Sequence, residues 1–129
     1  MTTAVVPTAA ALDADAFDAD AFDALAADDA VACRRIVRDH ARTFYLASTL
    51  LVPEKRRTAY ALYAFCRVAD DLVDAARTEG TAWVARQLAD YERKLSACLA
   101  GRPGDAVFRE LYRAVEAHDI PEAVLRELL

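Results

Sequence analysis

The stretch ALYAFCRVADDLVD, residues 61–74, decides the fold, because it has the pattern of a long apolar helix and yet carries three aspartates. At about 100° per residue, four polar side chains fall on one narrow stripe of that helix: Tyr63, Arg67, Asp70 and Asp74. Asp71 lies about 80° away from that stripe. The other faces are apolar, so we expect the helix to be buried and its polar stripe to face an interior cavity or cleft.

Two carboxylates one helical turn apart in such a place repel each other, and unpaired they would be protonated or destabilising. A divalent cation would relieve the repulsion. Mg²⁺ typically takes one or two protein carboxylates and completes its shell with water and substrate phosphate. Arg67 could add charge for a phosphate or anchor an aspartate. The acids could equally pair with Arg67 and Arg77 and have no further role, and the spacing alone does not decide between these hypotheses.

The composition around this helix predicts an all-α protein. The chain has 129 residues, enough for one small domain, and 56% of them are hydrophobic. Alanine, a strong helix former, supplies much of that fraction, and only three glycines and four prolines interrupt the chain.

Charge is distributed unevenly. Residues 1–33 hold seven aspartates and no lysine or arginine, and residues 13–24 repeat DADAF with a period of five that suits neither helix nor strand. We therefore expect residues 1–28 to be a disordered acidic tail. The rest of the chain is only mildly basic, which argues against a nucleic-acid partner.

Cap and breaker residues predict the helix boundaries. Asp28 or Asp29 could cap a first helix that runs to about Thr43, and a break is expected at STLLVP, residues 48–53. Pro53 suits the first turn of the helix that follows, to about Ala76. Later helices are expected over 82–100 with Thr81 as N-cap, from Asp105 to about Ala117, and after a capping box formed by Asp119 and Glu122.

The expected compartment is the cytoplasm. No run of about 18 apolar residues predicts a membrane span, and the acidic N-terminus does not resemble a signal peptide. Cys33, Cys66 and Cys98 are far apart and odd in number, so we expect free thiols.

A second motif lies just upstream of the acidic helix. HARTFYLAS, residues 40–48, brings a histidine, an arginine, a threonine hydroxyl and two aromatic rings together. Taken with LVPEKRRTAYALYAFCRVADDLVD, residues 51–74, it resembles the squalene/phytoene synthase family. The segments TFYLAS and ALYAFCR are more similar to phytoene synthases than to eukaryotic squalene synthases. The resemblance implies an isoprenoid-synthase-type helical bundle, of which residues 29–129 would be the N-terminal half.

The resemblance also implies an activity, the head-to-head condensation of two prenyl diphosphates through a cyclopropylcarbinyl intermediate. For a phytoene synthase, geranylgeranyl diphosphate would be converted to phytoene. The enzyme would be a transferase of carotenoid biosynthesis. Because its products are hydrocarbons, peripheral contact with the inner membrane face is an added expectation. The sequence fixes neither the substrate chain length nor the oligomeric state.

Residue roles follow from the same resemblance. Asp70 and Asp74 would coordinate Mg²⁺, with Mn²⁺ as an alternative, and Arg67 would contact the diphosphate. Tyr63 would lie near the phosphate or the intermediate. From the opposite wall, Arg42 and Thr43 would bind phosphate oxygens, Phe44 would line the hydrocarbon channel, and His40 would stand at the mouth of the cleft.

Two departures from the family pattern limit these roles. Ala41 stands where the family commonly has serine, which removes one hydroxyl from the phosphate wall. No second DxxxD follows Asp74, so the chain would supply one wall of the site and be inactive alone.

Two other functions fit part of the pattern. Asp70 to Asp74 also satisfies DDxxD, the motif of head-to-tail prenyl transferases and class I terpene cyclases, although HARTFYLAS has no natural place there. A half-length relative could alternatively be a non-catalytic interaction or assembly module.

Overall fold

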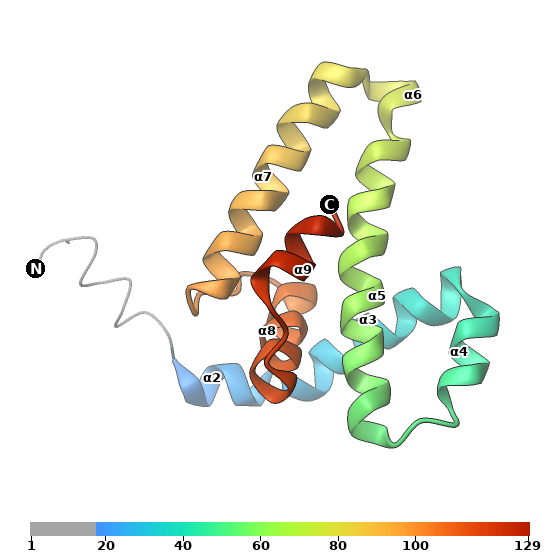
Figure 1. Ribbon diagram of the computed structural model, residues 1–129, viewed down its shortest axis with the longest axis vertical. Helices are drawn as coiled ribbons and strands as arrows, with labels where there is room; N and C mark the ends of the chain where they lie inside the picture. The colour runs from blue at the N-terminus through green and yellow to red at the C-terminus, as the bar shows by residue number, and fades with distance from the viewer. Residues whose placement is uncertain (1–17) are drawn as a thin grey trace, which may run out of the picture.

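The computed structural model describes residues 18–129, and every regular element among them is a helix (Figure 1). This confirms the all-α prediction. The helices are α2 (Ala19–Ala24), α3 (Ala26–His40), α4 (Arg42–Ser48), α5 (Pro53–Asp74), α6 (Ala76–Glu79), α7 (Thr81–Leu99), α8 (Ala106–His118) and α9 (Glu122–Glu127). Figure 1 shows α5 and α7 as two long helices joined through α6 at one end. α3 and α8 pack against α5 and against each other.

The local sequence explains the two ends of α5. The predicted break falls at residues 49–52, and Pro53 occupies the first turn, where its missing N–H costs nothing. The helix ends at Asp74, with Ala75 as C-cap. Its buried face consists of aromatic and small residues, and the small ones let neighbouring helices approach closely: Tyr60, Ala61, Ala64, Phe65 and Ala69.

Two groups of buried side chains flank α5. On one side, Phe65 meets Tyr91 of α7 and Phe108 of α8, and the Tyr91 hydroxyl donates a hydrogen bond of 2.7 Å to the Phe65 carbonyl. On the other side, Cys33 and Val37 of α3 pack against Tyr60 and Ala64. α5 is therefore the central helix, and the core fixes its position from both sides.

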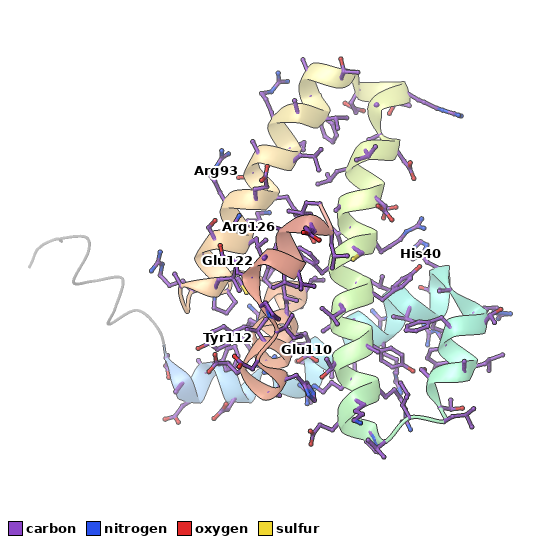
Figure 2. All side chains as sticks on the ribbon, viewed as in Figure 1. His40, Arg93, Glu110, Tyr112, Glu122 and Arg126 are labelled. Carbon is purple, nitrogen blue, oxygen red and sulfur yellow. The ribbon has the colours of Figure 1, made fainter. Side chains whose placement is uncertain are left out.

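A buried charge network ties α3 and α8 to α5. The carboxylate of Asp29, only 1% exposed, accepts hydrogen bonds of 2.8 and 3.0 Å from Arg109 and of 2.8 Å from Arg113. Glu110, also 1% exposed and labelled in Figure 2, accepts two bonds of 2.8 and 2.7 Å from Arg57 and one of 2.9 Å from Arg113. Removing the Asp29 carboxylate would leave the Arg109 guanidinium, whose side chain is 20% exposed, without its charged partner.

The stability of this network should depend on pH through Asp29. Burial alone would raise the pKa of Asp29, but hydrogen bonds and charge from Arg109 and Arg113 outweigh burial and lower that pKa below 3.8. A carboxyl group whose pKa is lowered by folding stabilises the fold above its unfolded-state pKa, and this contribution is lost as the pH falls through the folded-state pKa. We expect the free energy of unfolding to fall below about pH 4, and to fall less steeply in Asp29→Ala. Urea unfolding at a series of pH values measures both slopes, and equal slopes would rule out this role for Asp29.

The predicted disordered tail is wrong over residues 18–28. Asp18 caps α2 by accepting hydrogen bonds from the backbone N–H groups of Asp20 and Ala21, and α3 begins at Ala26. Phe22 makes an edge-to-face contact with Tyr112, and the Arg113 guanidinium lies 3.9 Å from the centre of the Phe22 ring. These contacts with α8 outweigh the weak local pattern. The rest of the predicted tail, residues 1–17, lies outside the described residues.

Three predicted caps are also wrong. Asp29 lies inside α3 and turns to the charge network instead of capping the helix. Asp119 adopts the left-handed conformation (φ 51°) that ends α8, so it cannot start a capping box with Glu122. Gly80, with φ 90°, takes the N-cap position expected for Thr81. By contrast, Asp105 caps α8 as predicted, accepting a bond of 3.0 Å from the Phe108 N–H.

The predicted first helix is divided in two at Ala41, whose backbone (φ −146°, ψ 69°) is not helical. No glycine or proline marks this break in the local sequence.

Within residues 18–129, no helix combines the length and the apolar composition that a membrane span needs. The three cysteines are free thiols, and burial raises the pKa of Cys33 and of Cys98 to about 12.

Candidate active site

The predicted site residues lie on two helices that meet through aromatic rings. Phe44 of α4 stacks on Tyr63 of α5, with ring centres 5.7 Å apart and planes 24° from parallel. One turn away, Tyr45 stacks on Tyr60, with centres 6.0 Å apart. The HARTFYLAS segment and the acidic stripe are therefore neighbours in space, as the resemblance implies.

Arg67 has a different partner from the one expected. Its Nε lies 3.0 Å from Oδ1 of Asp71, one turn along α5, although the pair lacks the alignment of a hydrogen bond. Asp71 lies four residues after Arg67, the spacing at which side chains on one helix are neighbours, so the two meet although Asp71 is outside the predicted polar stripe. The alternative in which Asp70 and Asp74 pair with Arg67 and Arg77 is not observed within residues 18–129.

The carboxylates of Asp70 and Asp74 are exposed, and neither makes an ion pair or a hydrogen bond with a described residue. They lie in the last two turns of α5, which has no basic residue in its final turn. The C-terminal end of a helix carries a partial negative charge, so this end combines three like-signed contributions. These contributions favour a bound cation, against the opposing charge of Arg77, which lines the same hollow as Asp74.

The donor set fits part of a Mg²⁺ shell. Asp70 and Asp74 offer hard carboxylate oxygens on successive turns, and Mg²⁺ binds through one or two carboxylates, with water and phosphate as its other ligands. No group of three His, Cys, Asp or Glu side chains suited to a metal occurs among the described residues. Cys66, one turn before Asp70, stays a thiol at neutral pH, because burial and then the Asp70 charge raise its pKa.

The remaining predicted residues lie at the junction of α3 and α4. His40 ends α3, where the chain enters α4 (Figure 2), and Arg42 and Thr43 form the first turn of α4. All three are exposed, and none bonds to the acidic stripe. The structure thus joins Phe44 to Tyr63, while it leaves the polar groups of α4 open to solvent.

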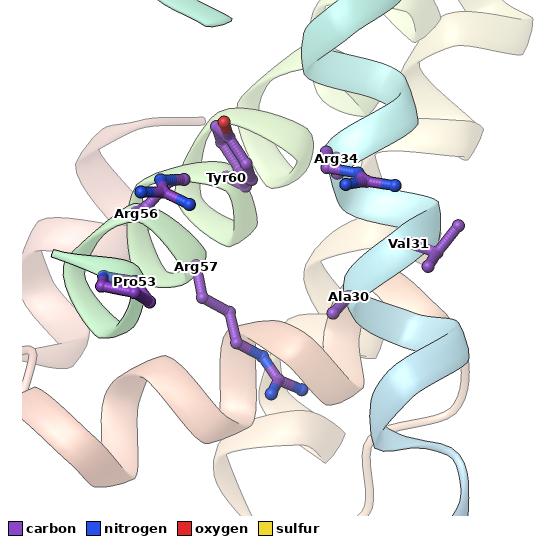
Figure 3. Close-up of a pocket in the computed structure, with 7 residues that line it drawn as sticks. All are labelled: Ala30, Val31, Arg34, Pro53, Arg56, Arg57 and Tyr60. Carbon is purple, nitrogen blue, oxygen red and sulfur yellow. The ribbon is translucent and has the colours of Figure 1, made fainter. Parts of the chain in front are cut away.

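A hollow of about 230 Å³ lies elsewhere, between α3 and the start of α5 (Figure 3). It contains none of the predicted site residues. Arg57 points out of it towards α8 and Glu110, and Arg56 bonds to backbone carbonyls. These two arginines are engaged in holding the fold, while Arg34, which also lines the hollow, is exposed.

Comparison with known proteins identifies the family. The sequence model of squalene/phytoene synthase matches residues 37–129. The chain belongs to the squalene/phytoene synthase family. It is 33% identical over 97 residues to a 15-cis-phytoene synthase of Synechocystis, covering 75% of this chain and 28% of that protein. It is 37% identical over 107 residues to a phytoene synthase of Cereibacter sphaeroides, covering 78% of this chain and 30% of that protein.

The chain thus spans less than a third of the length of these family members. One prediction about the acidic stripe, that it faces an interior cavity, is wrong for the described residues. The acidic stripe was expected to face an interior cavity, but Asp70 and Asp74 are exposed and no described helix covers them. The apolar half of the expectation is met by Phe65, which is fully buried, and by Leu72, which packs against the same core, but not by Val73, which is 49% exposed.

Sequence reasoning missed the residues that hold α4 in place. Ser48 is the last residue of HARTFYLAS, and its hydroxyl lies 2.5 Å from that of Tyr60. Arg56 donates hydrogen bonds to the carbonyls of Ser48 and Leu51. The only sequence signal is spacing, because Tyr60 precedes Tyr63 by one turn on the same helix.

Proposed function

We propose that this chain forms one wall of the active site of a prenyl transferase that condenses two prenyl diphosphates head to head. By likeness to the phytoene synthases that it matches, the substrate is geranylgeranyl diphosphate and the product phytoene. The observation that carries the proposal is the pair of exposed carboxylates, Asp70 and Asp74, which have no partner among residues 18–129. They lie on a helix whose upstream turn stacks against the basic and hydroxyl-bearing α4. Residues 29–129 would then be the N-terminal portion of a longer helical domain.

The α5 residues would hold the diphosphate through the metal and directly. Asp70 and Asp74 would bind Mg²⁺, or Mn²⁺ in its place. The bound cation would neutralise the charge of the departing diphosphate. Arg67 is kept in place by Asp71 at 3.0 Å and can direct its remaining N–H groups at phosphate oxygens. Tyr63 would lie between Arg67 and the aromatic wall.

The α4 residues would complete the opposite side. Arg42 and Thr43 are exposed donors for phosphate oxygens, and no side chain within residues 18–129 engages them. Phe44, held face to face with Tyr63, would line the hydrocarbon channel and stabilise the allylic cation through its ring. That cation forms when the carbon–oxygen bond breaks and the electron pair leaves with the diphosphate. His40 would stand at the mouth of the cleft.

The proposal can be tested by product analysis. A protein that continues this chain to family length is incubated with Mg²⁺ and with farnesyl or geranylgeranyl diphosphate. We expect a head-to-head hydrocarbon, phytoene from the second substrate, and none from residues 1–129 alone. A linear elongated diphosphate or a cyclic terpene would overturn the proposal. No product from a folded full-length protein would support the non-catalytic module instead.

A further inference from the structure

The seven-residue helix α4 carries three of the proposed substrate contacts, and it is joined to α5 by two stacked ring pairs and by Ser48. Ser48 is its one buried residue, 2% exposed. Arg42, Thr43 and Phe44 lie at its exposed end. Whatever holds Ser48 therefore has a large influence on where those three side chains lie.

Ser48 is held by a chain of two short hydrogen bonds. Its hydroxyl is 2.6 Å from the carbonyl of Tyr45 and 2.5 Å from the hydroxyl of Tyr60, which is 5% exposed. Serine has a single hydroxyl proton, and a carbonyl can only accept. Ser48 must therefore donate to Tyr45, and Tyr60 must donate to Ser48. Such chains polarise one another, so each bond strengthens the next.

Arg56 secures the same end of α4 from the first turns of α5. Its Nε donates to the Ser48 carbonyl at 3.2 Å, and its Nη2 donates to the Leu51 carbonyl at 3.0 Å. The Ser48 carbonyl belongs to the C-terminal end of α4, where a cation is favoured, and the Leu51 carbonyl lies in the connection that follows. Figure 3 shows Arg56 and Tyr60 projecting from neighbouring turns of α5.

We infer that Ser48 and Tyr60 are positioning residues for the diphosphate. Tyr60 lies one turn before Tyr63 on α5, so the Tyr60–Ser48 bond sets the distance between the α4 donors and the acidic stripe. The inference rests on the proposed function, because it assigns the purpose of this bond to the same substrate. Neither residue would touch the substrate.

The inference is tested by titrating the 129-residue chain with inorganic diphosphate and Mg²⁺ and recording the chemical shifts of its backbone amides by NMR. In the wild type we expect the amides of residues 42–44 and of residues 67–74 to shift together. In Ser48→Ala and Tyr60→Phe we expect the α4 shifts to be lost, the α5 shifts to remain, and the affinity to fall about two- to tenfold, the worth of one net hydrogen bond. The double variant should lose no more than either single one.

Thr49→Ala is the matched control. The Thr49 hydroxyl makes a bond of 2.7 Å to the Leu46 carbonyl, similar to that of Ser48, but it is exposed and has no partner on α5. Two outcomes would overturn the inference but leave the proposed function standing. In the first, Ser48→Ala and Tyr60→Phe bind like the wild type. In the second, they lose the α4 and α5 shifts equally and also have a lower melting temperature. No response of wild-type α5 to the ligand would overturn the proposed function itself. If Ser48→Ala does not fold by circular dichroism, Tyr60→Phe, which keeps the ring stacked on Tyr45, decides.

Discussion

Replacing Asp29 with alanine is expected to lower the free energy of unfolding by about 3–5 kcal/mol, the usual cost of breaking a buried ion pair from one side. Asp29 is the partner of both guanidinium contacts of Arg109, whose side chain is only 20% exposed. Without the carboxylate, this charge stays in the interior with little access to water. Urea unfolding followed by circular dichroism measures the loss.

Asp28→Ala supplies the control for this prediction. Asp28 lies in the same first turn of α3 but is exposed, so its loss should cost under about 1 kcal/mol through the helix dipole. Arg109→Ala combined with Asp29→Ala should cost less than the sum of the two single variants, because the double variant leaves no unpaired Arg109 charge. Equal urea midpoints for Asp28→Ala and Asp29→Ala would show that the network does not stabilise the fold.

Replacing Asp70 or Asp74 with asparagine in a family-length protein should lower Mg²⁺-dependent turnover by about 10²–10³-fold, because each change removes a metal ligand that supports charge development on the diphosphate. Both side chains are exposed and make no bond to a described residue, so the helical fold should be unchanged. Product formation at saturating Mg²⁺, with circular dichroism of the same samples, measures the two effects separately.

Asp71→Asn is the graded comparison for that experiment. Its carboxylate lies 3.0 Å from Arg67 and is engaged on the flank of the helix, so its loss should weaken turnover less than either metal ligand. Asp90→Asn on α7, where Asp90 pairs with Arg93 and Lys94, should have no effect. Turnover that survives in Asp70→Asn and Asp74→Asn would remove both residues from the metal site.

The sequence predicts those parts of the fold that depend on local rules. Apolar periodicity predicts α5, Pro53 marks its first turn, and Asp105 caps α8. Where the prediction fails, the cause is a contact between distant residues. Asp29 has the spacing of a helix cap, but its partners are 80 and 84 positions away, and nothing near it in the sequence signals them.

The candidate site was predicted to a similar extent. The helical wheel places Asp70 and Asp74 together, and both are available for a ligand. The family resemblance placed Phe44 and Tyr63 in the same site but did not predict that their rings stack. The Ser48–Tyr60 bond could not be predicted, because it depends on the non-helical backbone of Ala41, which sets the direction of α4.

The most direct test of the central claim is to add Mn²⁺ and inorganic diphosphate to the isotope-labelled 129-residue chain and to map paramagnetic broadening of its amide resonances. We predict broadening centred on residues 70–74, with a weaker effect at residues 42–44, and its loss in the double variant Asp70→Asn/Asp74→Asn. Broadening centred elsewhere, or equal in the wild type and the double variant, would contradict the assignment of this stripe as the diphosphate and metal wall.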